Sequence, residues 1–403
     1  MTSEITHTRA ARIQLAVVLG LLSCIGPLAV DAYLPAFPAI VSDLGASESA
    51  LQQSVGIYFV GLAGGQLILG PLSDRIGRRW PLMFGAVVLM IGSLGCAFAT
   101  NESQLIFWRL VQAIGGCAAM VISRAIVRDL FEPREGARFY SYMMLIGGLA
   151  PVLAPIIGGA LLITLGWRSI FWFLALYGVL WLALVIMYLP ESLPAEKRHP
   201  VGFGEVLRRY GLLLCDRQFV LYSLSGSLIS AMMFAYIAGS PFVFMNLNGV
   251  KPEHFGFFFG ANALGIMALG QFTRSLVVKY DMNRVLRAVL CMAATASCLT
   301  ALATLTGWFG FPGLLVPLFF AVASMGMVMP LSTALAMAPH GAMAGNASAL
   351  FGVMMFGVSG LSGFAVSALH NGTAWPMGIV IALCGIGALV ANLVLRPKFS
   401  APA

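Results

Sequence analysis

Long apolar runs recur along the whole chain, separated by short polar segments. Each run has about twenty residues, which is the length an α-helix needs to cross the ~30 Å hydrocarbon core of a bilayer. The pattern therefore predicts an all-α integral membrane protein with twelve transmembrane helices. The predicted spans are 13–34, 50–71, 80–99, 103–126, 139–163, 167–188, 219–241, 253–276, 284–305, 312–337, 342–369 and 373–395.

The longest polar interval, 190–218, divides the chain into an N-terminal half, 1–189, and a C-terminal half, 219–403. We interpret it as a cytoplasmic linker that contains a short amphipathic helix. The halves share pairs of residues at nearly constant offset, which favours two pseudo-symmetric six-helix bundles related as parallel repeats. The matching pairs are Gly65-Gln66 with Gly270-Gln271, Met143-Met144 with Met354-Met355, and Trp167 with Trp375.

Composition supports the same class of protein. The chain is 60% hydrophobic and 9% charged, whereas soluble domains carry about 25% charged residues, so a soluble enzyme is excluded. The net charge of +8 does not indicate a nucleic-acid partner, because the basic residues gather in the loops of one face and leave only Arg168 and Lys251 in the loops of the other. This positive-inside bias predicts that both termini are cytoplasmic. The basic loops include Arg75, Arg78, Arg79, Arg128, Lys197 and Arg198.

Several kinds of active site have no counterpart in the sequence. The seven cysteines form no C-x-x-C pair, and no H-E-x-x-H motif occurs, so we expect no metal site. There is no G-x-x-x-x-G-K-[ST] loop to bind ATP and no G-x-S-x-G motif of a hydrolase. We therefore expect neither an enzyme nor a cofactor.

One carboxylate lies inside the first span, in L-A-V-D-A-Y-L-P-A-F-P from Leu28 to Pro38. A charged group in a span costs about 2.5–3.5 kcal/mol on insertion scales, so it indicates a function. Arg109 lies about 9 Å into span four, and Asp31 lies about 27 Å along span one, which enters from the opposite face. Both therefore reach a similar depth, and we predict an Asp31–Arg109 pair, direct or through water.

A second motif, G-P-L-S-D-R-I-G-R-R, follows span two. It resembles the signature of the major facilitator superfamily, in which two six-helix bundles rock around a central cavity. The resemblance implies a cytoplasmic latch. A degenerate second copy of the motif runs from Ser275 to Arg284, and there Lys279 replaces the acid. The latch residues would be Gly70, Asp74, Arg75, Gly77, Arg78 and Arg79.

Two further motifs resemble those of antiporters in that superfamily. Arg109 and Gln112 fit R-x-x-Q-G imperfectly, and the resemblance implies that Arg109 acts in proton transfer. L-A-P-V-L-A-P-I-I-G-G in span five resembles G-P-x-x-G-G, with Ala154 where glycine is usual. Its prolines predict a kinked helix and its glycines predict close packing. The antiporter-motif residues are Pro151, Pro155, Gly158 and Gly159.

The Asp31 stretch, together with R-D-L-F at Arg128 to Phe131 and G-W-R-S-I-F at Gly166 to Phe171, resembles the bicyclomycin/chloramphenicol-resistance (Bcr/CflA) subfamily. Met and aromatic side chains suit a deformable site for varied apolar drugs. The candidates for the substrate cavity are Tyr33, Tyr58, Gln112, Tyr222, Ser225, Phe234, Tyr236, Asn262, Met325, Met329 and Ser332.

The resemblance implies a monomeric drug:proton antiporter of the bacterial inner membrane, whose partners are small-molecule drugs, protons and the lipid bilayer. Three alternatives stay open at this stage. The protein could export a physiological solute such as an amino acid or a peptide, or it could take up a solute by proton symport. It could also be a non-transporting receptor, but the buried charges of Asp31 and Arg109 count against that interpretation.

Overall fold

A computed structural model describes residues 9–131, 133–198 and 203–394, and every regular element in these ranges is a helix. Twelve helical segments within them are long and apolar enough to cross a membrane, as predicted. The segments are Arg12–Leu44, Glu48–Ile76, Arg79–Ala97, Glu102–Leu130, Ile146–Leu165, Arg168–Tyr188, Arg217–Leu247, Pro252–Lys279, Met282–Thr306, Gly310–Gly341, Gly345–Ala368 and Trp375–Val394.

The first segment extends beyond its predicted end at residue 34 and is broken into short helices. Proline lacks a backbone N–H and interrupts a helix, and Pro35 and Pro38 lie within the extended portion. Hydropathy alone does not register such breaks, because the segment as a whole stays apolar. The pieces are α1 (Arg9–Ser23), α2 (Ile25–Asp31), η2 (Leu34–Ala36) and α3 (Phe37–Leu44).

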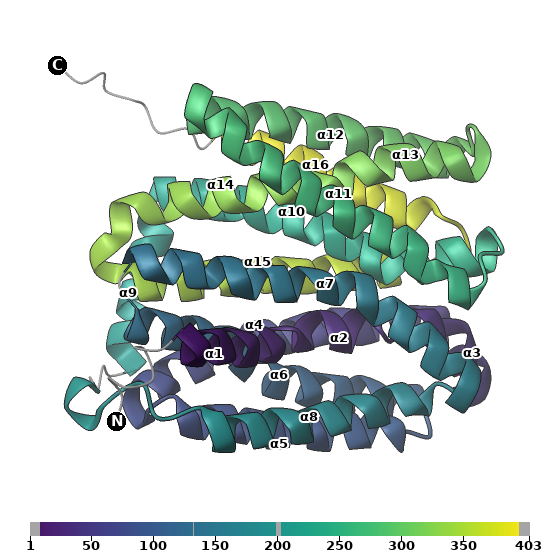
Figure 1. The fold of residues 1–403 in the computed structure, drawn as a ribbon. Helices are drawn as coiled ribbons and strands as arrows, with labels where there is room; N and C mark the ends of the chain where they lie inside the picture. The colour runs from purple at the N-terminus through teal and green to yellow at the C-terminus, as the bar shows by residue number, and fades with distance from the viewer. Residues whose placement is uncertain (1–8, 132, 199–202, 395–403) are drawn as a thin grey trace. The chain divides into compact units, whose positions relative to one another are not determined.

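Two compact units make up the chain. The first comprises 1–202 and 244–260, and the second comprises 203–243 and 261–403. In the first unit α6 packs against both α4 and α5, α5 packs against α8, and α7 contacts α1 and α2 (Figure 1). The side chains of Ser47 and Asn101 accept hydrogen bonds from the first turns of α4 and α6, which fixes where these helices begin. The helices are α4 (Glu48–Ile76), α5 (Arg79–Ala97), α6 (Glu102–Leu130), α7 (Pro133–Leu165), α8 (Arg168–Tyr188) and η3 (Ala195–Lys197).

The second unit is built around α10, which contacts α14, α15 and α16, while α12 packs against α13 and α16. Asp216 and Asp281 accept hydrogen bonds at the starts of α10 and α12. The elements are α9 (Phe203–Cys215), α10 (Arg217–Pro241), η4 (Phe242–Leu247), α11 (Pro252–Lys279), α12 (Met282–Thr306), α13 (Gly310–Ala323), α14 (Met325–Met337), η5 (Ala338–Met343), α15 (Ala344–Ala368) and α16 (Trp375–Val394). The unit boundary passes through η4 and α11. The first eight and last nine residues lie outside the described ranges.

Candidate functional site

Asp31 is the last residue of α2 and is 4% exposed. Among the described residues, its carboxylate has neither a hydrogen bond nor an ion pair. The helix α7 approaches this point closely, because a Cβ on Gly158 would overlap the carbonyl of Ala32. The structure thus brings one glycine of the predicted antiporter motif against the residue that follows Asp31.

Arg109 lies on α6 with no exposed surface. Its Nη1 donates to the carbonyl of Ala29 at 2.8 Å and to Oε1 of Gln112 at 2.6 Å. The guanidinium carbon lies 4.8 Å from the ring centre of Tyr33 and 4.3 Å from that of Tyr58, within the range of cation–π attraction. We call this set (Tyr33, Tyr58, Arg109 and Gln112) the arginine cage.

The cage sits beside the helix that carries Asp31, since Ala29 precedes Asp31 by two residues in α2. In the described structure, however, no direct ion pair joins Asp31 to Arg109. Nε and Nη2 of Arg109 are buried and have no acceptor among these residues. The arrangement is therefore a buried cation with uncommitted donors next to a buried acid without a counter-ion.

Supporting hydrogen bonds hold the cage in place. Gln112 donates from Nε2 to Ser93 Oγ at 2.8 Å, so its amide bridges α5 and Arg109. Gly92 lets α5 approach α6 closely, because a Cβ on this glycine would lie 2.5 Å from the backbone nitrogen of Gln112. The hydroxyls of Tyr33 and Ser54 are 2.9 Å apart. Neither Ser93 nor Ser54 was predicted from the sequence, since a single serine in an apolar run carries no signal of its partner.

The predicted latch forms a network at the loop between α4 and α5. Arg78 is 2% exposed and donates to Asp74 at 2.6 Å, to Ser73 at 2.8 Å and to Asp129 at 2.7 Å. The hydroxyl of Ser73 donates in turn to the carbonyl of Gly70. Asp129 was recognised in the sequence only as part of R-D-L-F, and its role in this network was not predicted.

Glu191, from the segment interpreted as a cytoplasmic linker, also belongs to this network. Its carboxylate accepts from the backbone N–H groups of Arg78 at 2.8 Å and Arg79 at 3.3 Å, which begin α5. An anion at a helix N-terminus is favoured by the helix dipole. Gly77 precedes them with φ of +97°, and a Cβ there would meet the same carboxylate, so both its backbone conformation and its contacts require glycine.

The pKa of Arg78 reflects opposing effects. Burial lowers it, but the hydrogen bond and charge of Asp129, followed by the charge and hydrogen bond of Asp74, raise it by more. The net pKa lies above the ordinary value for arginine, so the guanidinium stays charged and depends on its carboxylates.

Arg75 lies in the last turn of α4, one residue beyond Asp74.

The remaining antiporter-motif residues lie on α7. This helix runs through Pro151 and Pro155 as a single element rather than two. Gly159 faces the backbone of Pro252 and Glu253 at the start of α11, because a Cβ on this glycine would lie 3.5 Å from the carbonyl oxygen of Pro252. Both glycines of the pair are therefore placed where another backbone passes nearby.

Two of the cavity candidates in the second unit contact each other. Asn262 donates to the hydroxyl of Tyr236 at 2.9 Å, and both side chains are buried. Tyr222 instead donates to Asn283 at 2.6 Å, in the first turn of α12. Phe234 lies near Phe356, and Met325 and Met329 are half-buried on α14. Ser225 bonds to Leu221 of its own helix, whereas the buried Ser332 hydroxyl has no partner among the described residues.

Residues 19–364 match the family model described as Major Facilitator Superfamily. The chain belongs to this superfamily. An uncharacterized MFS-type transporter, YdgK, of Bacillus subtilis is 39% identical over 384 residues, which cover 93% of each chain. A bicyclomycin resistance protein homolog of Haemophilus influenzae is 30% identical and covers 94% of this chain and 95% of its own.

A chloramphenicol resistance protein of Pseudomonas aeruginosa is 28% identical, covering 98% of this chain and 93% of its own. These relatives agree with the Bcr/CflA subfamily indicated by the sequence motifs. The solved structure of the nucleoside transporter NupG matches 96% of this chain and all of its own, with a TM-score of 0.76 at 13% identity, which shows the fold alone. This major facilitator is thus a multi-pass membrane transporter and not an enzyme.

Proposed function

We propose that this major facilitator exports small drug-like molecules, of the chloramphenicol and bicyclomycin type, in exchange for protons across the bacterial inner membrane. It works as a monomer with both termini in the cytoplasm, and protons are its coupling ion in place of any cofactor. The names of two relatives, a bicyclomycin resistance protein homolog and a chloramphenicol resistance protein, support the choice of substrate class.

The observation that carries the proposal is Asp31, a buried carboxylate without a partner among the described residues, next to the arginine cage. Burial disfavours the charged form of an acid, and a nearby cation or water favours it. A small change in water access or in the distance to Arg109 therefore changes whether Asp31 holds a proton. This sensitivity is what alternating access requires of a coupling site.

In the proposed cycle, Asp31 takes up a proton from the periplasm while the transporter faces outward and releases drug. After the change to the inward-facing state, drug capture accompanies proton release into the cytoplasm. The uncommitted donors of Arg109 stabilise the ionised carboxylate at that stage, directly or through water. One charge moving down 100 mV supplies about 2.3 kcal/mol, which maintains a gradient of a neutral drug of roughly fifty-fold.

The test uses proteoliposomes with an imposed pH gradient and radiolabelled chloramphenicol. We expect drug to move against the proton flux, and we expect Asp31→Asn to lose at least tenfold of this driven transport while retaining exchange of labelled for unlabelled drug. Asp43→Asn is the matched control, because Asp43 lies in the same segment but is 47% exposed and pairs with Arg168. Drug movement in the same direction as protons, or full coupling in Asp31→Asn, would contradict the proposal.

A further inference from the structure

An apolar groove of about 740 Å³ lies between α12 and α13, within the second unit. It shares no residue with the cavity candidates. Its walls include Leu299 and Leu302 of α12 and Val316 and Phe320 of α13, whose exposed fractions are 47%, 41%, 60% and 46%. The groove therefore opens onto the outer surface of two membrane-spanning helices.

A strained turn closes one end of the groove. Phe309 has φ of +56°, and it is the one residue other than glycine with positive φ in the described ranges. Its ring stacks on that of Trp308, with ring centres 4.8 Å apart. Trp308 is 59% exposed and Phe309 is 74% exposed. A residue other than glycine in this conformation costs about 1–3 kcal/mol, and such residues cluster at ligand-binding and active sites, so this turn is a candidate ligand site.

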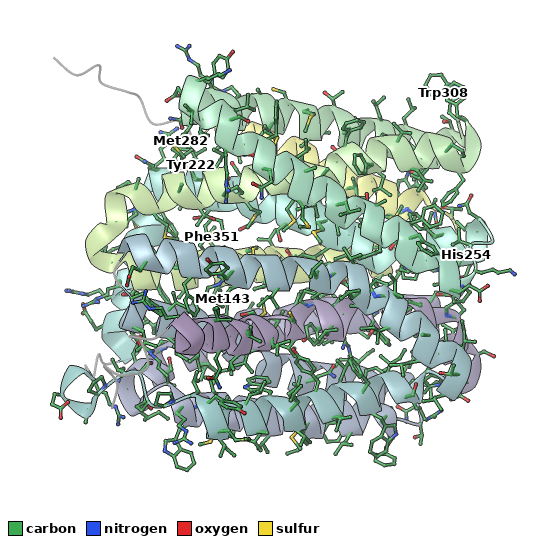
Figure 2. The ribbon with its side chains drawn as sticks, viewed as in Figure 1. Met143, Tyr222, His254, Met282, Trp308 and Phe351 are labelled. Carbon is green, nitrogen blue, oxygen red and sulfur yellow. The ribbon has the colours of Figure 1, made fainter. Side chains whose placement is uncertain are left out.

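The position of this turn relates the groove to the bilayer. Figure 2 shows Trp308 at the connecting end of the α12–α13 hairpin, far from Met282 at the other end of α12. Tryptophan is enriched at the membrane–water interface. From that end the groove extends to Met292 on α12 and Phe320 on α13. Measured from the helix ends at the turn, Thr306 and Gly310, these positions lie about 21 Å and 15 Å along the two helices. The length along α13 matches the ~15 Å depth of one leaflet of hydrocarbon, and the length along α12 exceeds it.

The chemistry of the walls selects a hydrocarbon ligand. The one hydroxyl among the lining residues belongs to Thr295, and it donates to the carbonyl of Cys291 at 2.9 Å in its own helix. A drug with several polar groups would leave them unpaired in such a site. We propose that this groove binds one acyl chain of a bilayer phospholipid, with its glycerol end at the Trp308–Phe309 pair and its methyl end towards the membrane midplane.

The test uses the full-length transporter in nanodiscs of phosphatidylethanolamine and phosphatidylglycerol. These are doped with a phosphatidylcholine that carries a photoreactive diazirine within one acyl chain, and crosslinked peptides are mapped by mass spectrometry. We expect labelling of the α12 and α13 groove peptides at least threefold above that of α16. Val316→Trp fills the groove and should reduce this excess to the α16 level. Leu383→Trp on α16 is the matched control, since Leu383 is 61% exposed and Val316 is 60% exposed.

A second variant tests the proposal independently, so that misfolding of Val316→Trp would not leave it undecided. Glycine adopts positive φ at no steric cost, so Phe309→Gly relieves the backbone while removing the stacking partner of Trp308, and it should also lower the groove labelling. Equal labelling of the groove and α16 in the wild type, or labelling unchanged in both groove variants, would overturn the proposal. Displacement of the lipid label by chloramphenicol would also overturn it and assign the groove to substrate. None of these readouts depends on transport.

Discussion

Arg109 is held by its shape as much as by its charge. Its guanidinium lies against the rings of Tyr33 and Tyr58 while one nitrogen donates to both Ala29 and Gln112. Only a planar, multiply donating cation makes all of these contacts at once, since the ammonium of lysine is a compact point charge. The cage therefore fixes the position of the charge relative to α2.

This geometry predicts the effect of a conservative substitution. Arg109→Lys keeps the charge but loses the stack on the two tyrosines and at least one hydrogen bond. Charge-assisted hydrogen bonds contribute about 1.5–3 kcal/mol, so we expect pH-driven chloramphenicol transport to fall at least tenfold. The measurement is the proteoliposome assay, with Arg168→Lys as control because Arg168 is 42% exposed and pairs with Asp43. Transport at the wild-type rate in Arg109→Lys would mean that charge alone suffices.

The sequence predicted the ionisable members of the site but not the groups that hold them. Asp31 and Arg109 stand out because a charge in an apolar run is costly, whatever the fold. Ser93, Ser54 and Glu191 are ordinary in their local sequence. Their roles arise only when α5, α4 and the segment after α8 meet their partners Gln112, Tyr33 and Arg78. Tyr33, Tyr58 and Gln112 were predicted to line a cavity. The structure places them around Arg109 as fully buried side chains.

At the scale of elements, the latch network joins the ends of three helices through one side chain. Arg78 connects Asp74 of α4 with Asp129 of α6, while Glu191 accepts from the first backbone groups of α5. The two carboxylates that pair with Arg78 differ in environment: Asp74 is 51% exposed and Asp129 is 12% exposed. Solvent screens the first pair far more than the second.

This difference predicts an order of stabilities. Asp129→Asn leaves the buried Arg78 without its better-shielded carboxylate, and breaking a buried pair costs about 3–5 kcal/mol. Asp74→Asn removes a largely exposed partner, for which about 0–1 kcal/mol is typical. We therefore expect Asp129→Asn to lower the thermal midpoint of the detergent-solubilised protein clearly more than Asp74→Asn does. Equal shifts for the two variants would show that Arg78 does not depend mainly on Asp129.

Helix number was predictable because span length follows from bilayer thickness, but breaks within spans were not. The first segment continues to Leu44 through three short helices, and it remains apolar despite the prolines there. The tenth predicted span is likewise divided at Ser324 between α13 and α14. Local backbone interruptions depend on which helices pack against the free carbonyl and N–H groups, and a single sequence does not contain that information.

At the scale of the whole molecule, the number of buried acids sets the charge moved in each cycle. Asp31 is the one carboxylate that is buried among the described residues, so the proposed exchange carries one proton inward for each drug molecule outward. A neutral drug then makes the cycle move one net charge, whereas a drug with a single positive charge makes it electroneutral.

The two kinds of drug should therefore respond differently to membrane potential. A potential of about 60 mV acting on one charge corresponds to about 1.4 kcal/mol, a tenfold change in the steady-state gradient. In proteoliposomes with a valinomycin-clamped potassium potential and no pH gradient, chloramphenicol accumulation should change about tenfold per 60 mV. Accumulation of the permanent cation ethidium should stay constant after correction against liposomes without protein. A hundredfold change for chloramphenicol would require two protons per cycle, and the second would need a carboxylate other than Asp31.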